Sequence, residues 1–385
     1  MADITKNPMY RFLLVLTVSS TLGFQAWRTL FNNFAHDVAQ LSGQHVGVIQ
    51  SVREIPGFLA LLAVYVLLVM REHKLSALSV LALGLGVSMT GFFPSFAGLT
   101  FTTLLMSFGF HYFETTNQSL TLQYFDKATA PRVFGNLRGL AAGANIAAGL
   151  IIFVVTPYLA FREIYLLMGG VVVAAAGWAF LGDPTDKDLV PQRKRMVFRG
   201  KYWLFYFLTF MAGARRQIFV AFAVFLLVQR FDYSVREVTA LFVANNVINY
   251  FLSPYIGKAI VRFGERRVLS LEYGSLVLVF LAYALVDNRW IGGVLYVLDH
   301  IFFNFAIAIR TYFQKIGDPR DVAPSMAVGF TINHIGAVVL PALGGVLWMV
   351  DFRIVFYMGA AMAAVSLVAV QAIRTEDAEV LVVGK

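Results

Sequence analysis

The chain has 385 residues, of which 59% are hydrophobic and only 14% are charged. Soluble domains are about 45–50% apolar and about 25% charged, so the composition excludes an ordinary soluble protein and predicts an integral membrane protein. The absence of cysteine excludes disulfides, thiolate metal sites and thiol nucleophiles. The net charge of +9 does not indicate nucleic-acid binding, because the basic residues are distributed between apolar stretches.

A helix that crosses a membrane needs about 20 mostly apolar residues. The first such stretch follows Lys6 and Arg11, as in a signal peptide, but it is too long and no small-residue cleavage site follows, so we predict that it is the first span. We predict an all-α membrane protein with twelve transmembrane helices, at residues 10–34, 46–70, 75–94, 97–123, 134–157, 163–181, 202–229, 237–257, 268–286, 290–314, 325–349 and 353–373.

One connection is longer and more polar than the others. The segment Gly182–Lys201, GDPTDKDLVPQRKRMVFRGK, is basic, contains two prolines and follows the sixth predicted span. We therefore expect an N-terminal six-helix half at 1–181, a basic cytoplasmic linker at 182–201 and a C-terminal six-helix half at 202–385.

The basic residues also predict the orientation. With a cytoplasmic N-terminus, 20 of the 31 Lys and Arg residues fall on the cytoplasmic side, 5 fall on the outer side and the others lie within spans. Cytoplasmic loops are enriched in Lys and Arg. We expect a multi-pass protein of the cytoplasmic (inner) membrane with both termini in the cytoplasm.

The two halves resemble each other in sequence. Arg28–Phe34, RTLFNNF, has a counterpart 188 residues later in Arg216–Phe222, RQIFVAF. His111–Phe125 similarly resembles His300–Phe313, since both begin with a histidine and end with Tyr-Phe. A repeat of this kind predicts two halves related by pseudo-symmetry.

Two six-helix halves joined by a basic cytoplasmic linker resemble the major facilitator superfamily. Gly257–Arg267 resembles the loop motif of that family, although Val261 stands where the family has aspartate, and the equivalent loop at Val69–Lys74 is more degenerate. The resemblance implies the fold of this superfamily and secondary transport by alternating access. It also implies that the first, second, fourth and fifth spans of each half line a central cavity.

Charged residues inside the spans follow this expectation. Because a charge at the bilayer centre is costly, such residues should face protein or water. Those on the spans expected to line the cavity are Arg28, Arg53, Glu54, His111, Glu114, Arg138, Arg215, Arg216, Asp299, His300, Arg310 and His334. Glu272 is the one interior acid elsewhere, about one turn from the cytoplasmic end of the ninth span.

The candidate substrate site is built on two arginines. Arg28 and Arg216 hold matching places in the repeat, and a guanidinium offers a planar fork of donors that suits phosphate or carboxylate. The pair resembles the arginines of organophosphate/phosphate antiporters. The other expected substrate-binding residues are Gln25, Asn32, Asn246, Asn249 and His300. The alternative is that both arginines are structural partners of Glu114, Asp299 or helix carbonyls.

Proton coupling requires a carboxyl group that gains and loses a proton within the membrane. Glu114 with His111 on the fourth span is the first candidate, and Glu54 and Asp299, beside His300, come next. The alternative interpretation of each of these acids is that it belongs to a structural ion pair.

No two histidines lie at a spacing typical of metal ligands, and the sequence contains no nucleophile motif and no nucleotide-binding loop. The sequence therefore carries no signature of an enzyme, a metal site or a cofactor site. The favoured function is secondary transport of a small organic or inorganic anion, coupled to protons or to a counter-solute, by a monomer in the lipid bilayer. A proton-coupled exporter of drugs or amphiphilic compounds is the first alternative. A non-transporting membrane sensor or scaffold is the second.

Overall fold

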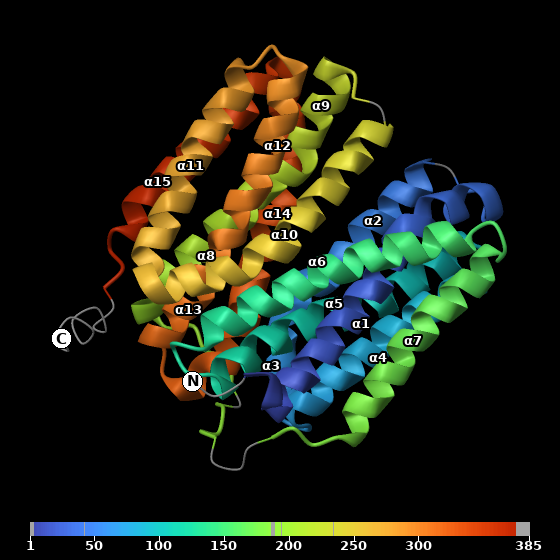
Figure 1. Cartoon of the computed structure of the whole chain (residues 1–385), viewed down its shortest axis with the longest axis horizontal. Helices are drawn as coiled ribbons and strands as arrows, with labels where there is room; N and C mark the ends of the chain where they lie inside the picture. Colours follow the sequence, from blue (N-terminus) through green and yellow to red (C-terminus); the bar gives the residue numbers. More distant parts are fainter. Residues whose placement is uncertain (1–3, 42, 186–188, 194, 234, 375–385) are drawn as a thin grey trace. The chain divides into compact units, whose positions relative to one another are not determined.

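The computed structural model describes residues 4–41, 43–185, 189–193, 195–233 and 235–374 (Figure 1). These residues form helices and no strand, so the predicted all-α class is confirmed. Residues 186–188 and 194 of the predicted linker, and 375–385 of the predicted cytoplasmic tail, lie outside the described residues.

Contacts divide the chain into two compact units. Unit 1 comprises Met1–Tyr124, Leu137–Met196 and Ala323–Thr331, and unit 2 comprises Phe125–Asn136, Val197–Val322 and Ile332–Lys385. Helices α6 and α14 therefore contribute to both units. The division into two halves at the 182–201 linker remains a prediction.

The helices of unit 1 are drawn in blue to green in Figure 1. They are η1 (Ile4–Lys6), α1 (Pro8–Asn33), η2 (Phe34–Val38), α2 (Gly43–Phe58), η3 (Leu59–Leu62), α3 (Ala63–Val66), α4 (Glu72–Thr90), α5 (Phe96–Tyr124), most of α6 (Ala130–Val155) and α7 (Phe161–Leu181).

The helices of unit 2 follow in yellow-green to red (Figure 1). They are η4 (Gly200–Tyr202), α8 (Trp203–Gln217), η5 (Ile218–Ala223), α9 (Val224–Phe231), α10 (Val235–Phe263), α11 (Glu265–Leu285), α12 (Arg289–Phe303), η6 (Asn304–Ala306), α13 (Ile307–Ile316), η7 (Pro319–Asp321), the second part of α14 (Val322–Val350) and α15 (Phe352–Val370).

Each predicted span coincides with a helix or with helices joined end to end. Among the described residues, 8 helices are long and apolar enough to cross a membrane. Helix α1 has 26 residues, and α5, α10 and α14 have 29 each, which at about 1.5 Å per residue also exceeds a hydrocarbon core of about 30 Å. The largest boundary difference is in α10, which continues to Phe263 instead of ending at 257.

Side-chain caps explain where several helices begin. Asn7 precedes α1, and its Oδ1 accepts hydrogen bonds from the backbone N–H groups of Met9 at 2.8 Å and Tyr10 at 3.2 Å. Asn288 caps α12 and Asp351 caps α15 in the same way. These caps satisfy backbone donors that have no partner within the helix and that hydrocarbon cannot solvate.

The second predicted span is not one regular helix. Pro56 lacks an N–H group, and the chain passes from α2 through the 3₁₀ turn η3 into α3. Thr331 Oγ1 donates to the Phe58 carbonyl at 3.0 Å and accepts from the Leu61 N–H at 3.0 Å. Tyr112 donates its hydroxyl to the Leu59 carbonyl at 3.3 Å. Side chains thus satisfy the backbone groups that the break would leave unpaired.

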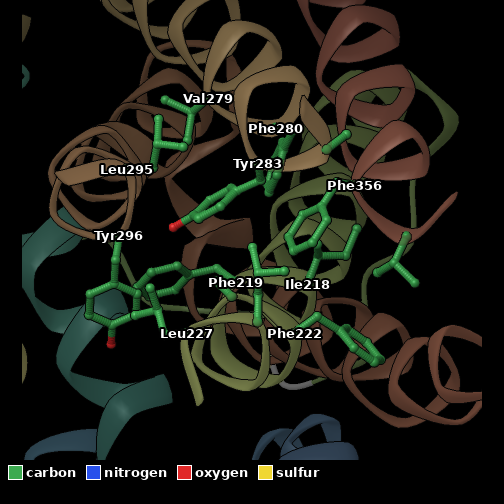
Figure 2. Close-up of a cluster of buried hydrophobic side chains, with 14 of the residues drawn as sticks. Ile218, Phe219, Phe222, Leu227, Val279, Phe280, Tyr283, Leu295, Tyr296 and Phe356 are labelled. Atoms are coloured by element: carbon green, nitrogen blue, oxygen red, sulfur yellow. The ribbon is translucent and has the colours of Figure 1, made fainter. Parts of the chain in front are cut away.

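Unit 2 has an aromatic core in which α11, α12 and α15 pack around α8, η5 and α9. Figure 2 shows Ile218, Phe219, Tyr283, Tyr296 and Phe356 within this cluster. The rings of Tyr283 and Phe356 stack with centroids 5.0 Å apart, and those of Phe219 and Tyr296 stack at 4.9 Å. Stacked aromatic pairs of this kind add to the free energy gained by burying their apolar area.

The loop motif of the sequence has a structural explanation. Gly264 lies between α10 and α11 with a φ of 77°, a conformation that side-chain-bearing residues rarely adopt. The next residue, Glu265, is buried and pairs with Lys315 Nζ at 2.9 Å. Arg266 Nε donates to Gln371 Oε1 at 3.1 Å. The motif therefore turns the chain and ties α11 to α13 and α15.

The outer surfaces of several helices are apolar. The side chains of Phe153 and Leu181 in unit 1 are 79% and 86% exposed, and Leu278 in unit 2 is 69% exposed. Such extensive exposure of large apolar residues suits contact with lipid and would promote aggregation in water. The exposure pattern agrees with a multi-pass membrane protein.

Prediction for helix packing in unit 2. A Cβ atom at Gly213 on α8 would lie 2.1 Å from the carbonyl oxygen of Asn333 on α14, so the two backbones can approach only because Gly213 has no side chain. Gly213→Ala should therefore lower the free energy of unfolding by about 1–3 kcal/mol. The measurement is thermal denaturation of the purified protein in detergent. Gly274→Ala on α11 is the control, because nothing lies within 4 Å of its Cβ position. Equal unfolding midpoints for the two variants would contradict the close approach.

Candidate functional site

In unit 1, polar and aromatic side chains from α1, α2 and α5 meet around Phe24. The Phe24 and Phe110 rings stack nearly parallel, with centroids 4.2 Å apart. The guanidinium carbons of Arg28 and Arg53 each lie 5.9 Å from the Phe24 centroid, and that of Arg53 lies 5.7 Å from the Trp27 ring. Cation–π contacts at this distance hold the two cations beside the aromatic pair.

The two arginines of this group differ in their environments. Arg53 is partly buried and its Nη2 atom lies 2.6 Å from Glu54 Oε1, so its charge is compensated by the neighbouring residue on α2. Arg28 is exposed on α1, whereas the preceding residue, Trp27, is fully buried and stacks on Phe31. A cation exposed in a membrane helix must face protein, water or a polar head group.

The hydrogen bonds of His111 indicate which nitrogen of its neutral imidazole ring carries the hydrogen. Its Nδ1 atom lies 2.9 Å from the Ser107 carbonyl oxygen and 3.0 Å from Ser107 Oγ. Ser107 Oγ donates its only proton to the Arg53 carbonyl, and a carbonyl can only accept, so Nδ1 carries the hydrogen. The basic nitrogen of His111 is therefore Nε2. An imidazole nitrogen of His111 and a carboxylate oxygen of Glu54 lie within 4.8 Å of each other.

The other predicted residues of unit 1 lie on the same helices. Gln25 is half-buried on α1, where its Nε2 donates to Thr29 Oγ1 at 3.2 Å, and Asn32 is exposed one turn beyond Arg28. Glu114 is half-buried on α5, three residues after His111. The structure thus brings Glu54, His111 and Arg28 to one group of three helices, with Glu114 on the same helix as His111.

In unit 2, the two adjacent arginines of α8 are separated by burial. Arg215 is 2% exposed, and its Nη2 atom lies 3.7 Å from Glu272 Oε1 on α11. Its Nη1 donates to Ser366 Oγ on α15, and its guanidinium carbon lies 4.5 Å from the Tyr273 ring centroid. Arg216 is half-buried, as expected for residues about 100° apart on a helix.

A chain of amide and imidazole groups joins α10 to α12. Asn304 Nδ2 donates to Asn249 Oδ1 at 2.5 Å and to the His300 carbonyl at 2.7 Å. Asn249 Nδ2 donates in turn to His300 Nε2 at 2.6 Å, so the neutral ring of His300 carries its proton on Nδ1. Asn246 donates to the Phe242 carbonyl of its own helix at 2.9 Å. Asn249 and His300 are thus bonded to each other.

Asp299 and His300 are neighbours in sequence but lie in different environments. His300 contacts Asn249 and the Phe219 ring, whose centroid is 5.7 Å away. Asp299 is 1% exposed and interacts electrostatically with Arg215 on α8. The sequence suggested the two residues as one candidate group, and their side chains take separate positions in unit 2.

Two buried polar features of unit 2 do not follow from the sequence. Glu272 is expected near the end of its span, whereas in the structure it pairs with Arg215 inside the unit. The feature of the sequence that could have indicated this role is that Glu272 is the only acid within an otherwise apolar span. Asn245 is 1% exposed, and its side-chain atoms have no hydrogen-bond partner within the described chain. Its signal was the four-residue spacing that places it on one face with Asn249 and Ser253.

Comparisons with known proteins agree with this architecture. The sequence profile of the Major Facilitator Superfamily matches residues 9–316 and, in a second match, residues 205–382. No curated protein matches the chain. The second profile match falls in the C-terminal half, where the repeat places the counterpart of Arg28.

Several solved transporters share the fold at low sequence identity. The E. coli fucose:proton symporter FucP is 12% identical over 95% of this chain and 98% of its own, with a TM-score of 0.74. The human organic anion transporter MFSD10 is 10% identical over 94% and 99%, with a TM-score of 0.76. A bacterial homologue of the iron transporter ferroportin is 14% identical over 94% and 98%, with a TM-score of 0.76.

The profile match covers most of the chain, and the helical fold, the repeated arginine helices and the apolar outer surfaces are consistent with it. Proteins of this fold move small molecules across membranes, so the chain is a transporter and not an enzyme. The protein is therefore a multi-pass membrane transporter that belongs to the major facilitator superfamily.

Proposed function

We propose that the chain is a secondary active transporter of a small organic or inorganic anion, working by alternating access. Transport is coupled to protons or to exchange of a second solute. The protein acts as a monomer in the cytoplasmic membrane, with both termini in the cytoplasm.

The proposal rests on a difference between two arginines that recurs in each unit: one is paired with an acid, and the other is more exposed. In unit 1 Arg53 is compensated by Glu54, and Arg28 is exposed. In unit 2 Arg215 is compensated by Glu272, and Arg216 is only half-buried. Arg28 and Arg216 occupy equivalent positions of the sequence repeat. Arg28 and Arg216 are thus the more exposed arginines of the two pairs, at matching positions of the repeat.

The chemistry of arginine fits this role. A guanidinium stays charged at all physiological pH values and binds phosphate or carboxylate through two parallel hydrogen bonds. The Phe24–Phe110 pair beside Arg28 would in addition accommodate an apolar or aromatic part of an organic anion. We assign direct recognition to Arg28 and Arg216, and supporting hydrogen bonds to Gln25, Asn32, Asn246, Asn249 and His300.

Proton coupling in unit 1 is assigned to Glu114, His111 and Glu54. An imidazole nitrogen of His111 and a carboxylate oxygen of Glu54 lie within 4.8 Å of each other, which supports a path for a proton between the two groups. Arg53 holds Glu54 in an ion pair at 2.6 Å, so Glu54 would release its partner when it binds a proton. Glu114 is half-buried one turn further along α5 and remains the leading carrier.

Export of drugs or amphiphilic compounds is the second candidate. The aromatic pair of Phe24 and Phe110 favours it, because stacked rings suit apolar ligands. A lipophilic cation would need an acid that is not already paired with arginine. Glu54 is paired with Arg53, which lowers its suitability for a cation.

Prediction for anion recognition. A ligand that binds the folded state raises its apparent stability by mass action. Purified protein should be stabilised against heat by one class among organophosphates, carboxylates and inorganic oxyanions, and not by lipophilic cations. Arg28→Ala and Arg216→Ala should each lose this stabilisation, because each removes one of the two guanidinium groups to which anion recognition is assigned. The measurement is the unfolding midpoint with and without each compound.

The matched control for these variants is Arg353→Ala. Arg353 is exposed at the start of α15, so its removal changes the net charge equally but should leave the response to anions intact. Stabilisation by lipophilic cations alone would refute the anion proposal and favour the drug exporter. Full anion stabilisation in Arg28→Ala and Arg216→Ala would show that these arginines are structural.

Prediction for coupling. Glu114→Gln removes a titratable carboxyl group while it keeps the size of the side chain. In proteoliposomes, uptake of the stabilising anion should lose its dependence on a pH gradient, and exchange of labelled for unlabelled anion should continue. Glu163→Gln is the control, because Glu163 only caps α7 by accepting from the Ala160 N–H at 2.8 Å. Unchanged proton-driven uptake in Glu114→Gln would exclude Glu114 as the carrier.

A further inference from the structure

Unit 2 contains a group of charges enclosed by its aromatic core. Arg215 from α8, Glu272 from α11 and Asp299 from α12 are 2%, 0% and 1% exposed. Arg215 Nη2 lies 3.7 Å from Glu272 Oε1, and Arg215 also interacts electrostatically with Asp299. We refer to these three residues as the buried triad.

The charges of the buried triad do not balance. One guanidinium interacts with two carboxyl groups, so the fully ionised triad would carry a net charge of −1. An uncompensated charge in a low-dielectric interior is costly, and the usual outcome is that the group neutralises. Uptake of one proton by either carboxylate brings the triad to zero net charge.

Among the described residues, the polar groups found to interact with the triad cannot supply the missing positive charge. They are Tyr273, whose ring lies beside Arg215, Tyr283 and Tyr296, which interact electrostatically with each other, and Ser366. Tyr283 also interacts with Asp299. A phenol or a hydroxyl group is neutral when protonated. Ser366 is occupied, because it accepts from Arg215 Nη1 and donates to the Met362 carbonyl at 2.8 Å.

Hydrogen bonding leads to the same conclusion. Within the described chain, both carboxylate oxygens of Glu272 and Oδ2 of Asp299 have no hydrogen-bond partner, and neither do Nε and Nη2 of Arg215. Buried carboxylates normally accept several hydrogen bonds. A protonated carboxyl group has one acceptor fewer to satisfy and gains a donor, which lowers the cost of burial.

The repeat shows that the fold does not require these charges. The residues of unit 1 at the equivalent positions are Trp27 for Arg215 and Phe110 for Asp299, from the arginine and histidine repeats. Helices α4 and α11 begin at Glu72 and Glu265, so Ser79 is the residue of α4 at the position equivalent to Glu272 of α11. Trp27 is 0% exposed and Ser79 bonds to its own helix, so the side chains at the equivalent positions of unit 1 are uncharged. Replacing buried ions by apolar residues is often neutral or stabilising.

We infer that Arg215, Glu272 and Asp299 form a binding site for one exchangeable proton, shared by the two carboxyl groups with Arg215 as the fixed counter-charge. This site is separate from the acids assigned to unit 1. Its use in coupling rests on the proposed function, whereas the bound proton itself does not.

The shared proton has a specific consequence for single substitutions. In Glu272→Gln or Asp299→Asn, one carboxylate remains opposite one guanidinium, and this pair is neutral without a proton. Either variant should therefore ionise the carboxyl group that remains. In Arg215→Met no counter-charge remains, so both carboxyl groups should be protonated.

The test is infrared difference spectroscopy of the purified protein, variant against wild type, at neutral pH in an alkyl maltoside detergent, which has no carbonyl group of its own. A protonated carboxyl group has a C=O stretching band that ionised carboxylates lack. Loss of the same band in both Glu272→Gln and Asp299→Asn supports the shared proton, as does return of the band when the wild-type protein is taken to high pH and back. In Arg215→Met, if it folds, the band should grow about twofold, since two carboxyl groups would then be protonated in place of one.

The controls and the contrary outcomes are equally direct. Asp287→Asn and Glu237→Gln neutralise acids of surface ion pairs with Arg230 and Arg289, so they should leave the band unchanged. Absence of the band in the wild type, its loss in only one of the two triad variants, or its persistence in both would overturn the inference. No anion is needed for this measurement. Failure of the anion panel with an intact band would therefore refute the proposed substrate and not the proton site.

Discussion

The bilayer does not solvate charges or unpaired backbone groups, and most irregular features of this protein are arrangements that meet this constraint. Arg53 is compensated by the adjacent Glu54, and Arg215 by Glu272 from another helix. The backbone break at Pro56 is closed by hydrogen bonds from Thr331 and Tyr112. Each compensation comes from inside one compact unit, so each unit forms its own set of buried polar contacts.

The same constraint explains why the two units differ although their sequences repeat. Unit 1 places Trp27 in its interior at a position where unit 2 places Arg215, and unit 2 adds Glu272 and Asp299 to the same group. The equivalent buried positions of the repeat can therefore hold either apolar or charged side chains. Burying charged side chains costs desolvation free energy that apolar side chains avoid. The most direct reason to retain the charged side chains is a process in which their charge changes, and proton transfer is such a process.

The helices and much of their spacing could be predicted from the sequence. Apolar runs of about 20 residues gave helix positions within a few residues, because hydrocarbon leaves the helix as the only way to satisfy the backbone of a single span. The candidate site was predicted less completely. Their charge within spans marks Arg28, His111 and Glu54 as candidates; Glu54 and His111 lie close together, and Arg28 lies beside Phe24 in the same unit. Glu272 and Asn245 were overlooked because position along the chain says little about which helix face meets which neighbour.

The sequence by itself determined that this is a membrane protein, where its helices lie, that its halves repeat and that arginines recur at one position, because composition, run length and periodicity are properties of the chain alone. Tertiary structure decided which of two adjacent residues is buried. Arg215 and Arg216 are indistinguishable in sequence, yet one is enclosed by Glu272, Tyr273 and Ser366 and the other is half-exposed. It also directed Asp299 and His300 into different surroundings. The physical reason is that the energy of a charge depends on the groups within a few ångströms of it, and helices distant in sequence supply those groups.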